Sequence, residues 1–171
     1  MQDLRVLIAD DDDDLREKLV VLLGRRGCLT REARNGAEVL DWLRASRDLA
    51  VAPPDVLLLD VRMPRFTGVD LVAQLRRAGW HLPIVLMTAL VDDEVRDAAV
   101  VWGAAAVLEK PFSSDTLETV LLNVTWLSER ARSGPSMPLN RPERSGTWPS
   151  ADATWPSAVE RWPKLDEERV G

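Results

Sequence analysis

The chain has 171 residues, of which 46% are hydrophobic and 29% are charged, and its net charge is −6. This composition suffices for one domain with a core and a short appendage, and the negative charge argues against general nucleic-acid binding. A single cysteine, Cys28, excludes a disulfide framework and favours a reducing compartment. We expect a cytoplasmic protein. The first apolar run, 6–9, is too short for a signal peptide, and the longest charge-free apolar stretch, 98–108, is too short to span a membrane.

Apolar runs and helical patterns alternate along the first three quarters of the chain. The predicted strands are 5–9, 28–33, 55–60, 83–88 and 105–108. The predicted helices are 15–23, 37–43, 68–77, 92–102 and a last one that is capped by Ser113 or Ser114. Residues 45–54, which include two prolines, are predicted to be a loose connection. This alternation indicates an α/β fold in which helices cover both faces of a parallel sheet.

Polar side chains stand where four of these strands end. They are Asp10, Asp11, Asp60, Thr88 and Lys110. Right-handed crossovers bring the carboxyl ends of parallel strands to one edge of the sheet, where such sheets bind their ligands. Neighbouring carboxylates repel one another unless a hard cation lies between them, and Mg²⁺ takes oxygen ligands. A metal-bound carboxylate beside a lysine and a hydroxyl suits phosphoryl transfer onto that carboxylate. Simple solvation would explain the acidic run 10–14 alone, but not the whole constellation.

Four motifs, in their order and spacing, resemble the receiver domains of bacterial two-component response regulators. They are Val6-Leu-Ile-Ala-Asp10-Asp11, Asp55-Val-Leu-Leu-Leu-Asp60-Val-Arg-Met-Pro64, Pro83-Ile-Val-Leu-Met-Thr88-Ala89 and Leu108-Glu109-Lys110-Pro111-Phe112. The resemblance implies a flavodoxin-like, doubly wound sheet of five parallel strands in the order 2-1-3-4-5. We therefore predict a receiver domain over residues 1–131 and a Pro-, Trp- and Ser-rich tail over residues 132–171.

The same resemblance implies a role for each polar residue. Asp60 is the expected phosphoacceptor, and its donor is a histidine kinase or a histidine phosphotransfer protein. The expected Mg²⁺ ligands are Asp10, largely through water, with Asp11, Asp60 and the backbone carbonyl of Arg62. Lys110 would pair with the phosphoryl oxygens, and a cis peptide bond is expected between it and Pro111. Thr88 would turn its hydroxyl toward the phosphoryl group and carry the signal outward.

Three features of this chain concern positions where it differs from the usual family pattern or where its own residues affect the expected chemistry. Val107 occupies the position of an aromatic switch residue, and the chain has no tyrosine, so the usual rotation of a ring is missing. The connection 45–54 is longer than usual, and we interpret it as a tolerated surface insertion. By resemblance, Arg62 and Leu90 flank the approach of the hydrolytic water. Because leucine cannot orient water, we predict slow loss of the phosphoryl group.

Two further segments have alternative interpretations. The apolar run Val100-Val101-Trp102 is either a dimerisation or partner surface, or a place where Trp102 merely closes the edge of the core. The tail repeats a Trp-Pro pair every seven residues, at Trp148, Trp155 and Trp162. Prolines exclude a continuous helix there. The tail is therefore either disordered or a multivalent docking peptide.

These observations favour a phosphorylatable response regulator that signals through a downstream protein, with no nucleic acid or membrane as partner. It would catalyse only its own phosphotransfer and dephosphorylation, and phosphorylation could drive it to dimerise. One alternative is a phosphorelay intermediate that passes the phosphoryl group to a histidine phosphotransfer protein. Another is a Mg²⁺-dependent hydrolase with Asp60 as nucleophile, although Arg62 stands where such an enzyme needs an acid or base.

Overall fold

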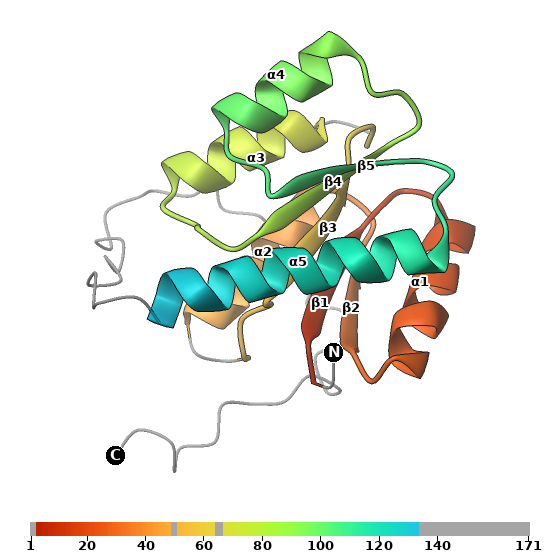
Figure 1. The fold of residues 1–171 in the computed structure, drawn as a ribbon. Helices are drawn as coiled ribbons and strands as arrows, with labels where there is room; N and C mark the ends of the chain where they lie inside the picture. Colours follow the sequence, from red (N-terminus) through yellow and green to blue (C-terminus); the bar gives the residue numbers. More distant parts are fainter. Residues whose placement is uncertain (1–2, 49–50, 64–66, 134–171) are drawn as a thin grey trace.

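The computed structural model describes residues 3–48, 51–63 and 67–133. Strands and helices alternate along these residues (Figure 1). In chain order they are β1 (Arg5–Ala9), α1 (Asp13–Arg25), β2 (Leu29–Ala33), α2 (Gly36–Arg47), β3 (Val56–Asp60), α3 (Gly68–Arg77), β4 (Ile84–Thr88), α4 (Asp93–Val101), β5 (Ala106–Glu109) and α5 (Ser114–Ser133). The predicted alternation of strand and helix is confirmed.

The strands form one parallel sheet with the order β2-β1-β3-β4-β5. Helices α1 and α5 cover one face of this sheet, and α2, α3 and α4 cover the other (Figure 1). The chain thus moves outward from β1 in both directions, which is the doubly wound arrangement predicted above. In this topology the carboxyl ends of the central strands β1, β3 and β4 adjoin at one edge of the sheet.

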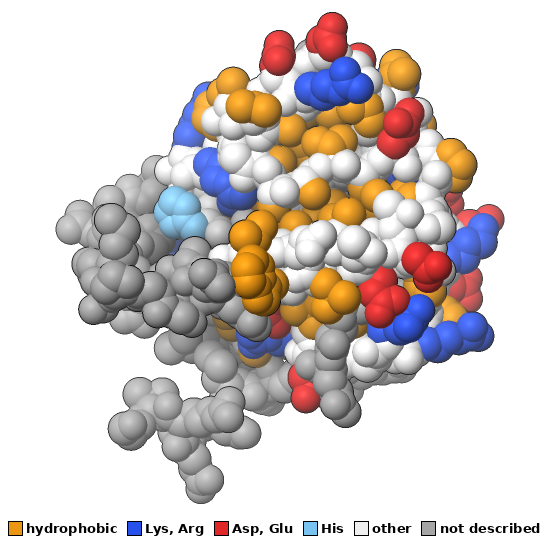
Figure 2. Space-filling view, viewed as in Figure 1, with side chains coloured by type: hydrophobic (Ala, Val, Ile, Leu, Met, Phe, Trp, Pro, Cys, Tyr) orange, Lys and Arg blue, Asp and Glu red, His pale blue; other side chains and the backbone are white. Residues whose placement is uncertain are grey.

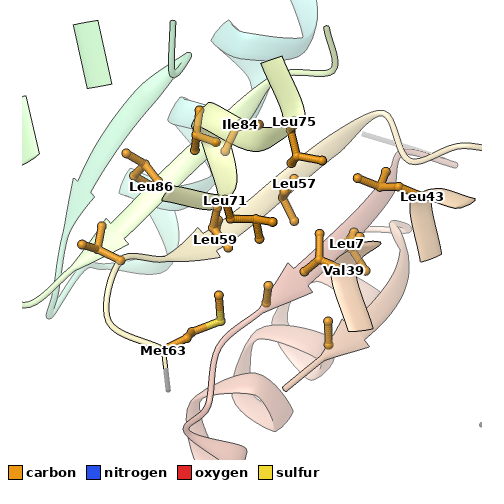
Figure 3. Close-up of a cluster of buried hydrophobic side chains, with 14 of the residues drawn as sticks. Leu7, Val39, Leu43, Leu57, Leu59, Met63, Leu71, Leu75, Ile84 and Leu86 are labelled. Carbon is orange, nitrogen blue, oxygen red and sulfur yellow. The ribbon is translucent and has the colours of Figure 1, made fainter. Parts of the chain in front are cut away.

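Strand β3 lies in the middle of the sheet, and every residue of it is buried. Its side chains alternate between two hydrophobic clusters, because successive strand residues point to opposite faces. Leu57 and Leu59 belong to the α2–α4 cluster, part of which Figure 3 shows. Val56 and Leu58 belong to the α1–α5 cluster on the other face. The strand is therefore fixed from both sides, and the same holds for the position of Asp60 at its end.

Helix α1 begins at Asp13, earlier than the predicted start at Leu15. The cause is the acidic run itself. The side chain of Asp12 caps the helix by accepting from the N–H of Leu15 at 3.1 Å, and Asp13 and Asp14 lie in the first turn, where the helix dipole favours negative charge. The five aspartates therefore divide into two groups, since the last three build a helix terminus and only the first two stand at the strand end.

The prediction of a loose connection over residues 45–54 was wrong in part. Helix α2 continues to Arg47, and Ala45 packs with Val51 and Ala52 in a small buried cluster of their own. The Ser46 hydroxyl is also satisfied, since it donates to the carbonyl of Leu43 at 2.8 Å. Burial of these small apolar side chains stabilises the last turn of α2 against the chain that follows it.

Helix α5 runs to Ser133, just beyond the predicted domain boundary at residue 131. The tail predicted over residues 132–171 lies outside the described residues from residue 134 onward. Among the described helices, none combines the length and apolar character needed to cross a bilayer.

Candidate functional site

The five polar residues predicted from the sequence gather at the carboxyl edge of the sheet. Asp10 and Asp11 follow β1, Asp60 ends β3, Thr88 ends β4 and Lys110 follows β5. The backbone joins two of these ends directly, because the Lys110 N–H donates to the Thr88 carbonyl at 2.7 Å. The peptide bond between Lys110 and Pro111 is cis, as expected.

Asp60 is buried, with 5% of its surface exposed, although it is a carboxylate. One oxygen, Oδ1, lies 2.7 Å from the Lys110 ammonium, and the other, Oδ2, accepts from the Arg62 N–H at 2.8 Å. Burial raises the pKa of the Asp60 carboxyl above its usual range, and the contacts with Lys110 and Arg62 only partly oppose this rise. The carboxylate is thus held in a fixed direction at a position where its negative charge is poorly solvated.

Asp10 is still more deeply buried, at 1% exposure, and it shares the same lysine. Its Oδ2 lies 2.6 Å from Lys110 Nζ, and its Oδ1 accepts from the Asp12 N–H at 3.0 Å. Burial alone would lower the pKa of Lys110, but its contacts with Asp10 and Asp60 outweigh that effect and raise it. One ammonium therefore bridges the two buried carboxylates and remains charged at neutral pH.

A third carboxylate, that of Asp11, completes an acidic cluster with Asp10 and Asp60. Each offers one oxygen atom, and the three atoms lie within 4.8 Å of one another. Asp11 is exposed to solvent, whereas the other two are buried. Oxygen donors on one side and an open side toward water suit Mg²⁺, which keeps several of its waters. The remaining predicted ligand group belongs to Arg62, whose backbone adjoins Asp60 and whose side chain is exposed.

Thr88 is buried at the end of β4, and its hydroxyl is engaged by a neighbouring loop. It donates to the Leu90 carbonyl at 2.9 Å and accepts from the Leu90 N–H at 3.2 Å. The hydroxyl thus stands at the predicted edge but bonds to its own loop. Any turn of this group toward a ligand must first release Leu90, whose side chain is 53% exposed.

The structure also places at this site a residue that the sequence interpretation missed. Arg16, in α1, is only 3% exposed, and its guanidinium contacts Asp13, Glu32 and the backbone carbonyl of Asp10. Burial favours the neutral form, but the two carboxylates outweigh it and raise the pKa of Arg16. A signal was present, because Arg16 precedes Leu19 and Leu23 on the buried face of the helix. A charge on that face required a partner.

The apolar run at the end of α4 divides into exposed and packed residues. Val100 and Val101 are 82% and 70% exposed, whereas Trp102 packs against the α2–α4 cluster and lies under the guanidinium of Arg77, 4.7 Å from the ring centroid. Trp102 therefore closes the core edge, and the two valines are free to make a surface. Figure 2 shows hydrophobic side chains gathered over the face formed by α4, β5 and α5. Val107, on β5, is half-buried against the same cluster.

A model of the response regulator receiver domain matches residues 6–122. The chain belongs to the response regulator receiver family. Response regulator MprA of Mycobacterium avium is 37% identical over 129 residues, which cover 75% of this chain and 53% of that protein. The MprA of Mycobacterium tuberculosis is equally similar, with 52% of it covered. This chain thus spans about half the length of these curated relatives.

Solved receivers have the same fold. The chemotaxis protein CheY4 of Vibrio cholerae matches with a TM-score of 0.63 and 30% identity, over 71% of this chain and 98% of that one. The receiver domain of the Francisella response regulator 1452 matches with a TM-score of 0.64 and 28% identity, over 76% of this chain and all of that one. This receiver is therefore a signalling domain of a two-component system, and its acidic edge corresponds in kind to the pocket in which receivers generally bind Mg²⁺.

Proposed function

We propose that this receiver accepts a phosphoryl group on Asp60 from a histidine kinase or a histidine phosphotransfer protein. The observation that carries this proposal is the pairing of the buried Asp60 carboxylate with Lys110 at 2.7 Å, inside the acidic cluster. Burial raises the pKa of the Asp60 carboxyl and so makes the carboxylate more basic. Its contacts with Lys110 and Arg62 fix its orientation, as attack on phosphorus requires.

In the proposed reaction, an oxygen of Asp60 forms a bond to phosphorus while the bond from phosphorus to the donor imidazole nitrogen breaks. The imidazole leaves with the electron pair of that bond. The Lys110 ammonium already contacts the attacking carboxylate and that of Asp10. During the transfer it can pair with the phosphoryl oxygens and neutralise their negative charge. Asp10, Asp11 and Asp60, with the Arg62 carbonyl, would hold Mg²⁺. When bound, this ion supplies the positive charge that neutralises the transferring oxygens.

Phosphorylation of the full chain by acetyl phosphate in Mg²⁺ buffer tests the assignment. Asp60→Asn should abolish the base-labile phosphate, because an amide is a poor nucleophile, and Asp11→Ala should weaken labelling at limiting Mg²⁺. The matched control is Asp55→Asn, at the other end of the same chain segment, where the carboxylate pairs with Arg5 at 2.6 Å. Labelling of the Asp60→Asn protein at the wild-type level would refute the proposal.

We propose further that the output is a protein contact made by the face of α4, β5 and α5. The exposure of Val100 and Val101 supports this proposal. Apolar side chains that are exposed together commonly mark a surface that a partner covers. Capture of a partner with and without phosphorylation tests this, and Val100→Ser with Val101→Ser should reduce it. Transfer of label from the phosphorylated chain to a histidine phosphotransfer protein would instead favour the phosphorelay alternative.

The tail is the second candidate for a partner contact, on the evidence of its repeated Trp-Pro pairs. If it docks, replacing Trp148, Trp155 and Trp162 together with alanine should abolish partner capture, because indoles anchor interfaces. The stability of the receiver should not change. Unchanged capture by this triple variant would support a tail without a binding role.

A further inference from the structure

Among the described residues, no side chain holds the Asp11 carboxylate in one orientation. It is exposed, and within the part of the chain that the structure describes no hydrogen bond or ion pair reaches it. Asp10 and Asp60 differ, since both are buried and both bind Lys110. The direction in which Asp11 presents its oxygens therefore depends on the backbone that precedes it.

Arg16 holds that backbone. Its Nη1 donates to the carbonyl oxygen of Asp10 at 2.8 Å, in a bond that is buried. Its Nε donates to the Glu32 carboxylate on β2 at 3.2 Å, and its Nη2 donates to Asp13 at the start of α1. A guanidinium is planar and presents its donors in a fixed fork, so these contacts together determine where the Asp10 carbonyl points.

The Asp10 carbonyl and the Asp11 nitrogen belong to the same peptide unit, which is rigid and planar. The same strand end has a second anchor, because the Asp10 N–H donates to the Ala33 carbonyl on β2 at 3.2 Å. With the peptide held at its oxygen and the preceding one held at its nitrogen, the Cα of Asp11 has little freedom to move. Without Arg16, the peptide between residues 10 and 11 could rotate, and the exposed carboxylate would move with it.

We infer that Arg16 is a positioning residue for the divalent cation: it orients the Asp10–Asp11 peptide so that the Asp11 carboxylate faces those of Asp10 and Asp60. Arg16 does not touch the cation in this arrangement, and it acts through the backbone. The inference rests on the proposed function, because it takes the acidic cluster to be a metal site. Replacing a residue that orients a metal ligand without touching the metal typically weakens metal binding by about 10- to 100-fold.

A simple structural role for Arg16 would have a different consequence. In that case its loss would lower stability but leave metal affinity unchanged in the molecules that remain folded. Arg5 provides the comparison, because it makes a comparable set of bonds to Asp55 at 2.6 and 2.9 Å, at the amino end of the sheet. A measurement that separates metal affinity from stability therefore decides between the two roles.

The experiment is a Mn²⁺ titration of the unphosphorylated full chain, followed by the electron paramagnetic resonance signal of the free ion, with urea unfolding measured in parallel without metal. Arg16→Gln should raise the Kd of Mn²⁺ by roughly 10- to 100-fold. Arg16→Lys should restore part of the affinity, because an ammonium can still reach one acceptor. Arg5→Gln should lower stability and leave the Kd of Mn²⁺ unchanged.

Glu32→Gln is the second variant, since the Glu32 side chain is 49% exposed and its replacement leaves Arg16 paired with Asp13. It should weaken Mn²⁺ binding in the same direction but less, and it decides the question if Arg16→Gln fails to fold. Wild-type affinity in Arg16→Gln, or equal losses in Arg16→Gln and Arg5→Gln, would overturn the inference. Failure of the metal site itself would appear differently, as Mn²⁺ binding that Asp11→Ala and Asp60→Asn do not weaken.

Discussion

Gly68 lies directly against the backbone of Asp60. A Cβ atom on Gly68 would stand 2.3 Å from the Asp60 carbonyl oxygen and 2.9 Å from the Cα of Val61. The Gly68 N–H also donates to the Val61 carbonyl at 2.8 Å. The first turn of α3 is therefore packed on the strand end that presents the proposed phosphoacceptor, and the atoms in the way are backbone atoms that cannot rotate aside.

We expect Gly68→Ala to lower the free energy of unfolding by roughly 1–3 kcal/mol, the usual cost of overpacking. It should also slow labelling by acetyl phosphate, because relief of the clash moves the end of β3. Gly24→Ala is the control, since a Cβ there meets nothing within 4 Å in the helix α1. It should stabilise the protein by about 0.5–1 kcal/mol. Urea unfolding and labelling rates check both, and equal stability of the two variants would contradict the argument.

The buried Asp60 carboxylate should make the receiver less stable at neutral pH. Its pKa in the folded protein is raised by burial, so the protonated form is favoured by folding. The stability that protonated Asp60 contributes is fully present below about pH 4, where an unfolded aspartate is protonated too. It is lost as the pH rises through the raised pKa of Asp60 in the folded protein. Asp60→Asn removes this ionisation and should stabilise the metal-free protein at pH 7 by roughly 0.5–2 kcal/mol, in the usual range for a stabilising substitution.

Urea unfolding of wild type and Asp60→Asn between pH 4 and 8, with a chelator present, measures this effect. The difference in free energy of unfolding should shrink as the pH falls toward 4. A variant that is less stable than wild type at pH 7 would mean that the contact between Asp60 and Lys110 outweighs the cost of burial.

Arg76 joins the end of α3 to the end of α4 at the opposite edge of the sheet. It donates to four backbone carbonyls, at distances between 2.8 and 3.1 Å: those of Trp80, Leu82, Trp102 and Gly103. Arg76→Gln should destabilise the protein by about 1.5–3 kcal/mol or more, since hydrogen bonds to a charged group are lost. Arg77→Gln, which loses the contact with the Trp102 ring, should cost about 0.5–1 kcal/mol. Phosphorylation of Asp60 should be unaffected in both, and a labelling defect would show that this edge influences the site.

Leu90 should prolong the lifetime of the phosphorylated receiver. Its side chain is exposed beside Thr88 and offers no acceptor to orient an attacking water. Leu90→Glu should therefore accelerate loss of the phosphoryl group, because in-line placement of water limits hydrolysis. The measurement is decay of labelled protein in Mg²⁺ buffer, with Leu122→Glu, an exposed leucine on α5, as the control. Equal decay in wild type and Leu90→Glu would refute this account.

The sequence determines the centre of this receiver more clearly than its periphery. β3 could be predicted because four apolar residues precede Asp60, and α3 was predicted with its observed bounds, Gly68–Arg77. The end of α2 was missed because the burial of Ala45 depends on Val51 and Ala52, which follow the helix in the chain. The convergence of charges at the strand ends followed from topology. The position of Arg16 did not, because its partner Glu32 lies on strand β2, far along the chain from α1. Its buried acceptor is a backbone carbonyl, which no residue type reveals.

The two hydrophobic clusters have no buried residue in common, since the sheet separates them. A substitution of Leu71 in α3 and one of Leu117 in α5 therefore act on different packing environments, and their effects on the free energy of unfolding should add. The face of α4 that carries the exposed valines is supported by only one of these clusters. Substitutions that repack the α2–α4 cluster can therefore change the surface around Val100 and Val101, and so the partner it fits. The packing of α1 and α5 on the other face of the sheet would stay the same.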